Sequence, residues 1–111
     1  MRGLFATLPV GLNAEDAAVV LAEAELIEAW NRHIRLFDAA SDPHDDALVT
    51  AARACTAQAG LRLAKTPAAG LIGLAVKAHH LALDIEEGHT DWSRPLAQAV
   101  LEDVRKLTAG A

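Results

Sequence analysis

Apolar residues recur every three or four positions through most of this sequence, and this spacing constrains the fold more than any other feature. The clearest run is Val20, Ala24, Ile27, Trp30, Ile34 and Phe37. Residues at this spacing lie on one face of an α-helix, whereas a half-buried strand would alternate apolar and polar residues. The other side of the segment carries the charged residues Glu25, Glu28, Arg32 and Arg35. The pattern therefore predicts a long amphipathic helix.

Capping residues divide the chain into four predicted helices. Asparagine, aspartate, serine and threonine are favoured just before a helix, and proline is favoured in its first turn. Such residues occur at Asn13, Asp42-Pro43, Thr66-Pro67 and Ser93, and they predict helices over residues 13–40, 43–65, 67–88 and 93–110. Acidic residues support the predicted starts of the first and second helices, because negative charge is favoured in the first turn of a helix. These residues are Glu15 and Asp16 in the first helix and Asp45 and Asp46 in the second.

The expected fold class is all-α, an antiparallel bundle of four helices or of three long helices and a short fourth. The connections are short, and short connections join antiparallel neighbours. Residues 1–12 are expected to form an N-terminal arm, and residues 13–111 a single helical domain. The predicted inner faces are Leu48, Ala52, Cys55, Ala59 and Leu63 in the second helix, Leu71, Leu74, Ala78, Leu81 and Ile85 in the third, and Ala97, Val100, Val104 and Leu107 in the fourth.

Composition narrows the class of protein. The sequence contains 25 alanines and few aromatic residues, so its helices can approach closely. The single cysteine excludes an intrachain disulfide and favours a cytoplasmic location. Cys55 lies among alanines and is predicted to be buried and inert. The net charge of −5 disfavours nucleic acids and anionic membranes as partners. No apolar run approaches the roughly 20 residues of a membrane span.

Five histidines raise the question of a metal site. The best candidate ligands are His80, Asp84, Glu87 and His89. However, His80 and Asp84 share a helix face with Lys77 and Glu87, which is typical of a solvated polar stripe with a local ion pair. The set matches no known zinc motif, so we expect the solvated stripe and no metal or other cofactor. No nucleophile has a base at a motif-like spacing, so no catalytic residue is predicted and the chain is not expected to be an enzyme.

The first predicted helix is longer than the third, so one end of its apolar face should extend beyond the bundle. Trp30, Ile34 and Phe37 cluster at that end and are expected to need cover. Trp92 lies just before the fourth helix, where it can pack against that helix or anchor a partner. These four residues form the predicted interface. The expected partner is a second copy of the chain, as a homodimer, or another protein.

Gly70 and Gly73 stand at the start of the third predicted helix, where each costs about 1 kcal/mol relative to alanine. Close approach of another helix is the favoured explanation, and a site where backbone amides meet a ligand is the alternative. Together these patterns predict a non-enzymatic interaction or regulatory module that works through a helical surface. The alternative function is a small metal-dependent protein or enzyme that uses histidine and carboxylate ligands.

Two segments of the chain resemble a loose group of small helical proteins from alphaproteobacteria. One is AELIEAW at residues 24–30 with its continuation RLFDAA at residues 35–40, and the other is TPAAGLIGLAVKA at residues 66–78. They cover the first three predicted helices. The resemblance implies a bacterial, prophage-associated origin, but no activity and no site residues.

Overall fold

The computed structural model describes residues 16–87 and 91–109, and four α-helices make up most of this part of the chain. The helices are α1 (Ala17–Ala39), α2 (Ala47–Lys65), α3 (Leu71–Glu87) and α4 (Ser93–Ala109), with a short 3₁₀ helix, η2 (Pro43–Asp45), between α1 and α2. No strand occurs within these ranges. The predicted all-α class and the bundle of four helices are therefore confirmed. Asn13 and the arm of residues 1–12 lie outside the described residues.

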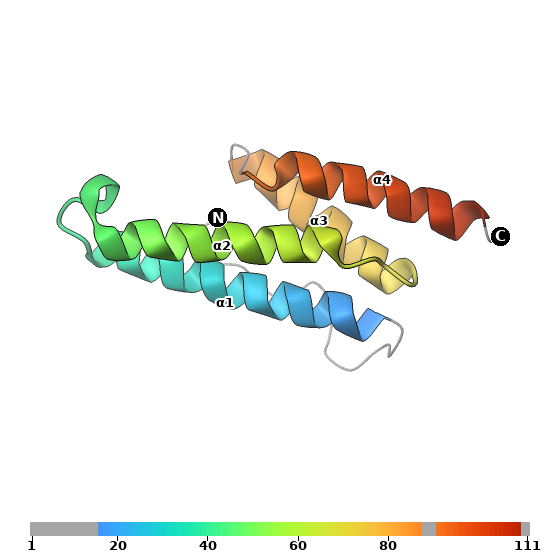
Figure 1. The fold of residues 1–111 in the computed structure, drawn as a ribbon, viewed down its shortest axis with the longest axis horizontal. Coiled ribbons are helices and arrows are strands. Elements are labelled where there is room, and N and C mark those ends of the chain that lie inside the picture. Colours follow the sequence, from blue (N-terminus) through green and yellow to red (C-terminus); the bar gives the residue numbers. More distant parts are fainter. Residues whose placement is uncertain (1–15, 88–90, 110–111) are drawn as a thin grey trace.

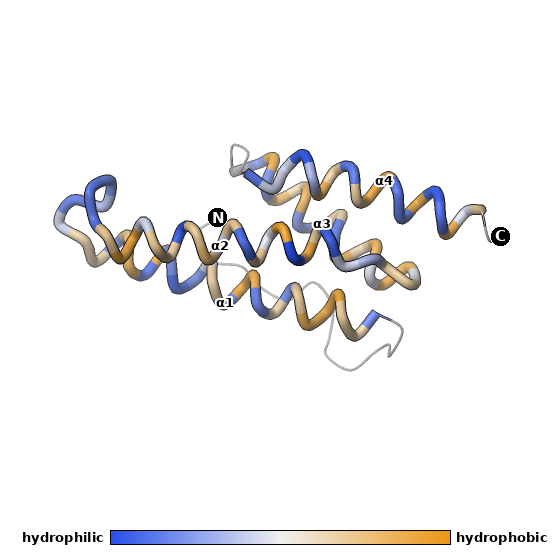
Figure 2. The backbone as a smooth tube through the Cα atoms, viewed as in Figure 1, coloured by the Kyte–Doolittle hydropathy of each residue, from blue (hydrophilic) through white to orange (hydrophobic). Residues whose placement is uncertain are grey.

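The four helices form two hairpins that cover each other over part of their length. α1 packs along α2, α3 packs along α4, and the two pairs meet through α2 with α4 and α1 with α3. The turn between α1 and α2 lies at one end of the molecule's long axis, beyond the end of the α3–α4 hairpin (Figure 1). Helices of 23 and 17 residues are about 35 and 26 Å long at 1.5 Å per residue. The α1–α2 hairpin therefore overhangs, and hydrophilic residues gather at its turn (Figure 2).

The predicted start of the second helix is wrong by four residues. Pro43 begins η2 instead, and α2 begins at Ala47. The Asp46 carboxylate accepts hydrogen bonds from the backbone amides of Leu48 and Val49, at 2.9 and 3.1 Å. Asp46 is thus the N-cap of α2 rather than a residue of its first turn, because its carboxylate satisfies amides that have no partner inside the helix.

The hydrophobic core lies where the two hairpins overlap. Its buried apolar residues come from all four helices and from the connection before α4: Val19, Ala22, Leu26, Ala59, Leu63, Ala64, Val76, Trp92 and Leu96. Every buried residue of α1 falls between Val19 and Leu26, in the N-terminal half of the helix. The C-terminal half of α1 belongs to the overhang and is covered on fewer sides.

The predicted inner face of α3 is only partly correct: Leu81 packs against the core and Leu74 is partly buried, but the other three residues are exposed. Leu71 and Ile85 are 77% and 53% exposed, and Ala78 is exposed as well. The helix instead buries a stripe on its other side, made of Gly73, Val76, Lys77, His80 and Asp84. Apolar spacing alone could not identify this face, because the buried stripe is mostly polar and its partners lie far away in the sequence.

The predicted inner faces of α2 and α4 are only partly correct. In α2, Ala52, Ala59 and Leu63 are buried, but Leu48 is 66% exposed and Cys55 is exposed, so the prediction of a buried thiol is wrong. In α4 the buried residues are Leu96 and Asp103, whereas Ala97 and Val104 are exposed. Leu96 comes one position before Ala97, and Asp103 one position before Val104. The buried face of α4 is therefore rotated by about 100° from the predicted face.

Candidate functional site

The buried polar stripe of α3 is the most unusual feature of the interior. Lys77 has no exposed surface, and its Nζ atom donates hydrogen bonds to Asp103 Oδ2 on α4 at 2.6 Å and to the Thr66 carbonyl at 2.8 Å. Asp103 is also buried. A buried lysine is costly to desolvate unless a charge and hydrogen-bond acceptors surround it, and both are present here.

A second buried pair ties α3 to α1. His80 is 3% exposed, and its Nε2 atom lies 2.7 Å from Glu23 Oε2, which is buried too. One turn further along α3, Asp84 accepts a hydrogen bond from the Ser93 hydroxyl at the start of α4. The other carboxylate oxygen of Asp84 has no hydrogen-bond partner among the described residues. The stripe thus contacts α4 at both ends, through Lys77 and Asp84, and α1 in the middle, through His80.

The prediction that Lys77, His80 and Asp84 form a solvated stripe is therefore wrong. These three residues do share one helix face, but among the described side chains they do not pair with one another. The groups instead pair with α1 and α4, at sequence separations of 57 residues for His80 and 26 residues for Lys77. A single sequence contains no local signal for pairs so far apart, although Glu23 breaks the charge pattern of α1 by standing between Ala22 and Ala24.

The candidate metal ligands are not brought together in the described part of the chain. No group of three or more histidine, cysteine, aspartate or glutamate side chains there has the arrangement to hold a metal ion. His80 is directed to Glu23 and Asp84 to Ser93. The Glu87 side chain and His89 lie outside the described positions. The structure thus gives His80 and Asp84 partners inside the protein.

A carboxylate occupies the N-terminus of α3. Asp16 has no exposed surface, and it does not cap its own helix, α1. Its Oδ1 atom accepts hydrogen bonds from the amides of Ala69 and Gly70 at 2.7 and 3.2 Å, and its Oδ2 atom accepts one from Gly73 at 2.8 Å. The first amides of a helix have no partner within it and favour negative charge. Asp16 therefore stabilises α3, and α3 accordingly begins later than predicted.

The contact with Asp16 explains why residue 73 is a glycine. The sequence alone allows two explanations for it, close approach of another helix or a site where backbone amides meet a ligand. A Cβ atom at Gly73 would lie 2.4 Å from Asp16 Oδ1, which is closer than atoms can approach. The glycine is thus needed for close approach, but to a side-chain carboxylate and not to another helix. The backbone amides at this end of α3 are occupied by Asp16 of the same chain, so they are not free to meet a ligand.

Replacing Gly73 with alanine should lower the free energy of unfolding by about 1–3 kcal/mol. The new Cβ atom would push the Asp16 carboxylate away from the backbone amides, and losing hydrogen bonds to a charged group costs about this much. Thermal or urea unfolding measures the effect. In an Asp16→Ala background the same replacement should be neutral or stabilising, because the clash is gone and alanine favours the helix. An equal loss in both backgrounds would show that Gly73 matters for another reason.

Trp92, one of the four predicted interface residues, is covered by the chain itself. It is 7% exposed, and its indole ring lies against Gly60 of α2, where a Cβ atom would be only 2.4 Å from the ring. Leu96 is buried beside it in the core. The packing role is thus the one that the structure supports, and little of the ring is left for a partner.

The other three predicted interface residues, Trp30, Ile34 and Phe37, are partly buried on α1. Trp30, His33 and Phe37 form edge-to-face ring contacts, with centroids 6.0 and 6.4 Å apart, and His44 continues the series at 5.8 Å from Phe37. Neither ring nitrogen of His33 has a hydrogen-bond partner among the described residues, although both are buried. The series therefore places an imidazole without hydrogen-bond partners among the described residues between two aromatic rings.

Burial, with a smaller effect of the Arg53 guanidinium, holds the pKa of His33 below its ordinary value of 6.5. As the pH falls through 6.5, the His33 side chain therefore binds a proton in the unfolded chain before it does so in the folded chain. The wild type should be most stable above pH 6.5 and should lose stability below it, until the pH reaches the lowered pKa. Urea unfolding between pH 8 and 5 should show a weaker loss for His33→Phe, and no such difference for His79→Gln at an exposed position. Equal slopes for wild type and His33→Phe would contradict the prediction.

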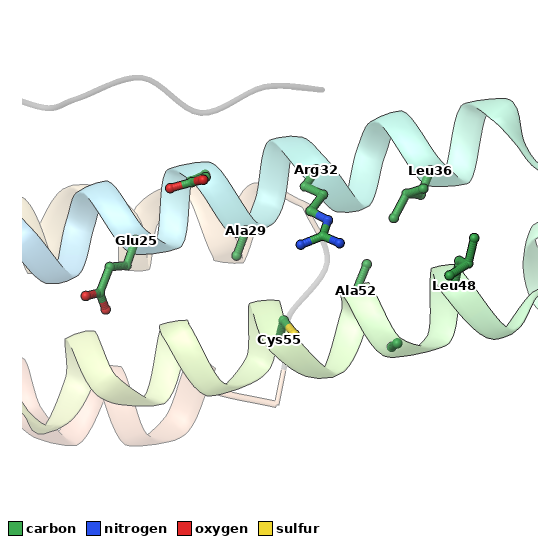
Figure 3. A pocket seen from close by; sticks show the side chains of 9 residues that line it. Glu25, Ala29, Arg32, Leu36, Leu48, Ala52 and Cys55 are labelled. Atoms are coloured by element: carbon green, nitrogen blue, oxygen red, sulfur yellow. The ribbon is translucent and has the colours of Figure 1, made fainter.

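A groove runs between α1 and α2 on the hairpin (Figure 3). Its volume is about 260 Å³, slightly below the usual range for ligand pockets. Small and apolar residues form most of the lining, with charges at the edge: Ala29, Leu36, Leu48, Ala51, Ala52, Cys55, Glu25, Glu28 and Arg32. Arg32 extends from α1 toward α2, and Cys55 lies on the α2 side of the groove (Figure 3). The lining offers apolar contact but few converging polar groups.

These features define a helical bundle that buries a few paired polar side chains beside its apolar core and leaves several large apolar side chains exposed. Within the described ranges, no helix is both long and apolar enough to cross a membrane. Comparisons with family models, curated proteins and solved structures found no match to this chain.

Proposed function

We propose that this chain is a non-enzymatic interaction module that associates with itself through a helical surface. One observation carries the proposal: large apolar side chains are exposed on the helices while charged side chains fill the interior beside α3. The most exposed of them are Leu21 on α1, Leu48 on α2, and Leu71 and Ile85 on α3. Exposed apolar patches on a folded domain are typical of interaction sites.

Two apolar surfaces are available for self-association. The first is the overhanging end of α1 with Trp30, Ile34 and Phe37, which the sequence predicts as an interface. The second is the outer face of α3, which carries Leu71 and Ile85. A second copy that covers either surface would remove apolar area from water, which stabilises by about 25 cal/mol per Å².

The buried polar groups support an interaction role over a catalytic one. Lys77, His80 and Glu23 are covered on all sides, so a substrate would reach them only if the helices moved apart. Lys77 pairs with Asp103 and His80 pairs with Glu23, which is the arrangement of structural buried pairs.

The mass of the full chain in solution tests the proposal. Light scattering at micromolar concentrations should give about twice the 11.7 kDa of one chain, and dilution should lower this value. A mass of 11.7 kDa at every concentration would contradict self-association.

A further inference from the structure

His33 carries two covered polar atoms that nothing in the described part of the chain satisfies. The residue as a whole is partly exposed, but both of its ring nitrogens are covered, and neither has a hydrogen-bond partner. One ring nitrogen of a neutral imidazole is a donor and the other an acceptor, and both become donors when the ring is protonated. Water satisfies them when the chain is open, so closing the structure around His33 costs these hydrogen bonds.

The surroundings of His33 also oppose a positive charge on the ring. α2 contributes the Arg53 guanidinium, which has the same sign as a protonated imidazole. η2 contributes His44, which lies against the far ring of the aromatic series, Phe37. On α1 itself, the residues one turn away on either side carry no charge: Ala29, Trp30, Leu36 and Phe37. Protonation would therefore place a cation here without a carboxylate to pair with it.

His33 lies in the part of the hairpin that has the least cover. It belongs to the C-terminal half of α1, in the overhang beyond the α3–α4 hairpin (Figure 1). The buried pairs of α3 and most of the core residues lie where the two hairpins overlap. Segments with fewer buried contacts open at a lower free energy than the core does. The overhang is therefore the segment expected to open first.

We propose that His33 makes the overhanging end of the α1–α2 hairpin an acid-sensitive device, in which protonation of the imidazole separates the two helices at this end and leaves the overlapped part closed. Opening lets water hydrate the charged ring and moves it away from Arg53. The overlap behaves differently, because a protonated His80 would still have an acceptor in the Glu23 carboxylate. This device does not depend on the self-association proposed above.

The direction of the effect follows from the two protonation equilibria. The closed structure holds the pKa of His33 below 6.5, whereas the opened end returns it to its ordinary value. Between these two values the proton binds mainly to the open form and stabilises it. Because one proton is involved, the equilibrium constant for opening rises by up to about tenfold for each pH unit in this range. Above pH 6.5 the end stays closed.

The reactivity of a buried thiol in the overhang tests the proposal. In a Cys55→Ser background, Val49→Cys places a thiol near the start of α2 at a position that is 1% exposed. The probe is a dipyridyl disulfide, and each rate is divided by that of a short cysteine peptide at the same pH. The relative rate should rise severalfold between pH 6.5 and 5.5, and by no more than about tenfold.

Three further variants in the same background separate the causes. His33→Phe should remove the rise, because the ring then binds no proton. His44→Gln, at the exposed histidine of η2, should leave the rise in place. Val76→Cys replaces Val49→Cys to place the thiol in the overlap, where residue 76 has no exposed surface, and should stay protected at both pH values. Circular dichroism shows whether each variant folds.

Each contrary result overturns a stated part of the proposal. An equal rise at residue 76 would mean that the whole bundle opens. A rise that persists in His33→Phe would mean that another group is responsible, and no rise in Val49→Cys would mean that the end stays closed. If Val49→Cys does not fold, amide hydrogen exchange of the wild type, corrected for the intrinsic effect of pH, gives the same comparison between the start of α2 and α3. NMR titration of wild-type His33 must also give a pKa below 6.5, and a higher value would overturn the device.

Discussion

Replacing Asp103 with alanine is expected to lower the free energy of unfolding by about 3–5 kcal/mol, the usual cost of removing one partner of a buried ion pair. Lys77 would keep its charge in a place with no exposed surface, and only the Thr66 carbonyl would still accept a hydrogen bond from it. Chemical unfolding monitored by circular dichroism measures the loss.

Two variants show whether the cost comes from the unpaired charge. Glu102→Ala, next to Asp103 but exposed and paired only with Lys106, should cost less than about 1 kcal/mol. The double variant Lys77→Met with Asp103→Leu should recover most of the loss, because apolar pairs often replace buried ion pairs without cost. If Asp103→Ala and Glu102→Ala had the same small effect, Lys77 would not be buried as described.

The second large effect is expected at Trp92. Replacing it with alanine should cost about 3–5 kcal/mol, the range for removing a large aromatic side chain from a core. The indole is 7% exposed and packs on Gly60, so its loss leaves a cavity between α2 and the start of α4. Urea unfolding gives the free energy, and the fluorescence of the wild type should be shifted to the blue by the buried ring.

Gly60 supplies the control for this prediction. Gly60→Ala should destabilise the wild type, since the new Cβ atom would overlap the indole ring. In the Trp92→Ala background the same replacement should be harmless or favourable, because the ring is gone and alanine favours the helix. Additive effects of the two replacements would show that the ring does not lie on Gly60.

The sequence predicts the helices well because their signals are local. Apolar spacing and capping residues place four helices, and the greater length of α1 places the overhang at its C-terminal end. The error at the start of α2 is also local, since Asp42 and Asp46 are both acceptable caps and only the structure shows which carboxylate reaches the free amides.

The faces of α3 could not be predicted in the same way. The spacing of Leu71, Leu74 and Leu81 fits the inner seam of a bundle, and it therefore predicts that the polar side of α3 lies outside. That choice depends on Glu23, Asp103 and Asp16, which lie on other helices or just before them and pair with α3 only after folding. Rules for local spacing cannot detect partners that are 26 to 57 residues away.

The buried pairs also explain why the bundle adopts one arrangement. His80 can reach Glu23 only if α3 lies in one register against α1, and Lys77 can reach Asp103 only in one register against α4. A shifted helix would leave charges buried without partners, which costs several kcal/mol for each group. The same pairs keep Leu71, Ala78 and Ile85 on the outward side of α3.

Side-chain hydrogen exchange tests most directly the claim that α3 buries its polar stripe. Nitrogen-edited NMR near neutral pH should detect the Lys77 ammonium and the His80 Nε2 proton as slowly exchanging signals, because both groups are buried and hydrogen-bonded. Lys65 and His79 are exposed and should exchange as fast as free side chains. If Lys77 and His80 exchanged as fast as Lys65 and His79, the stripe would be solvated and the account of α3 would be wrong.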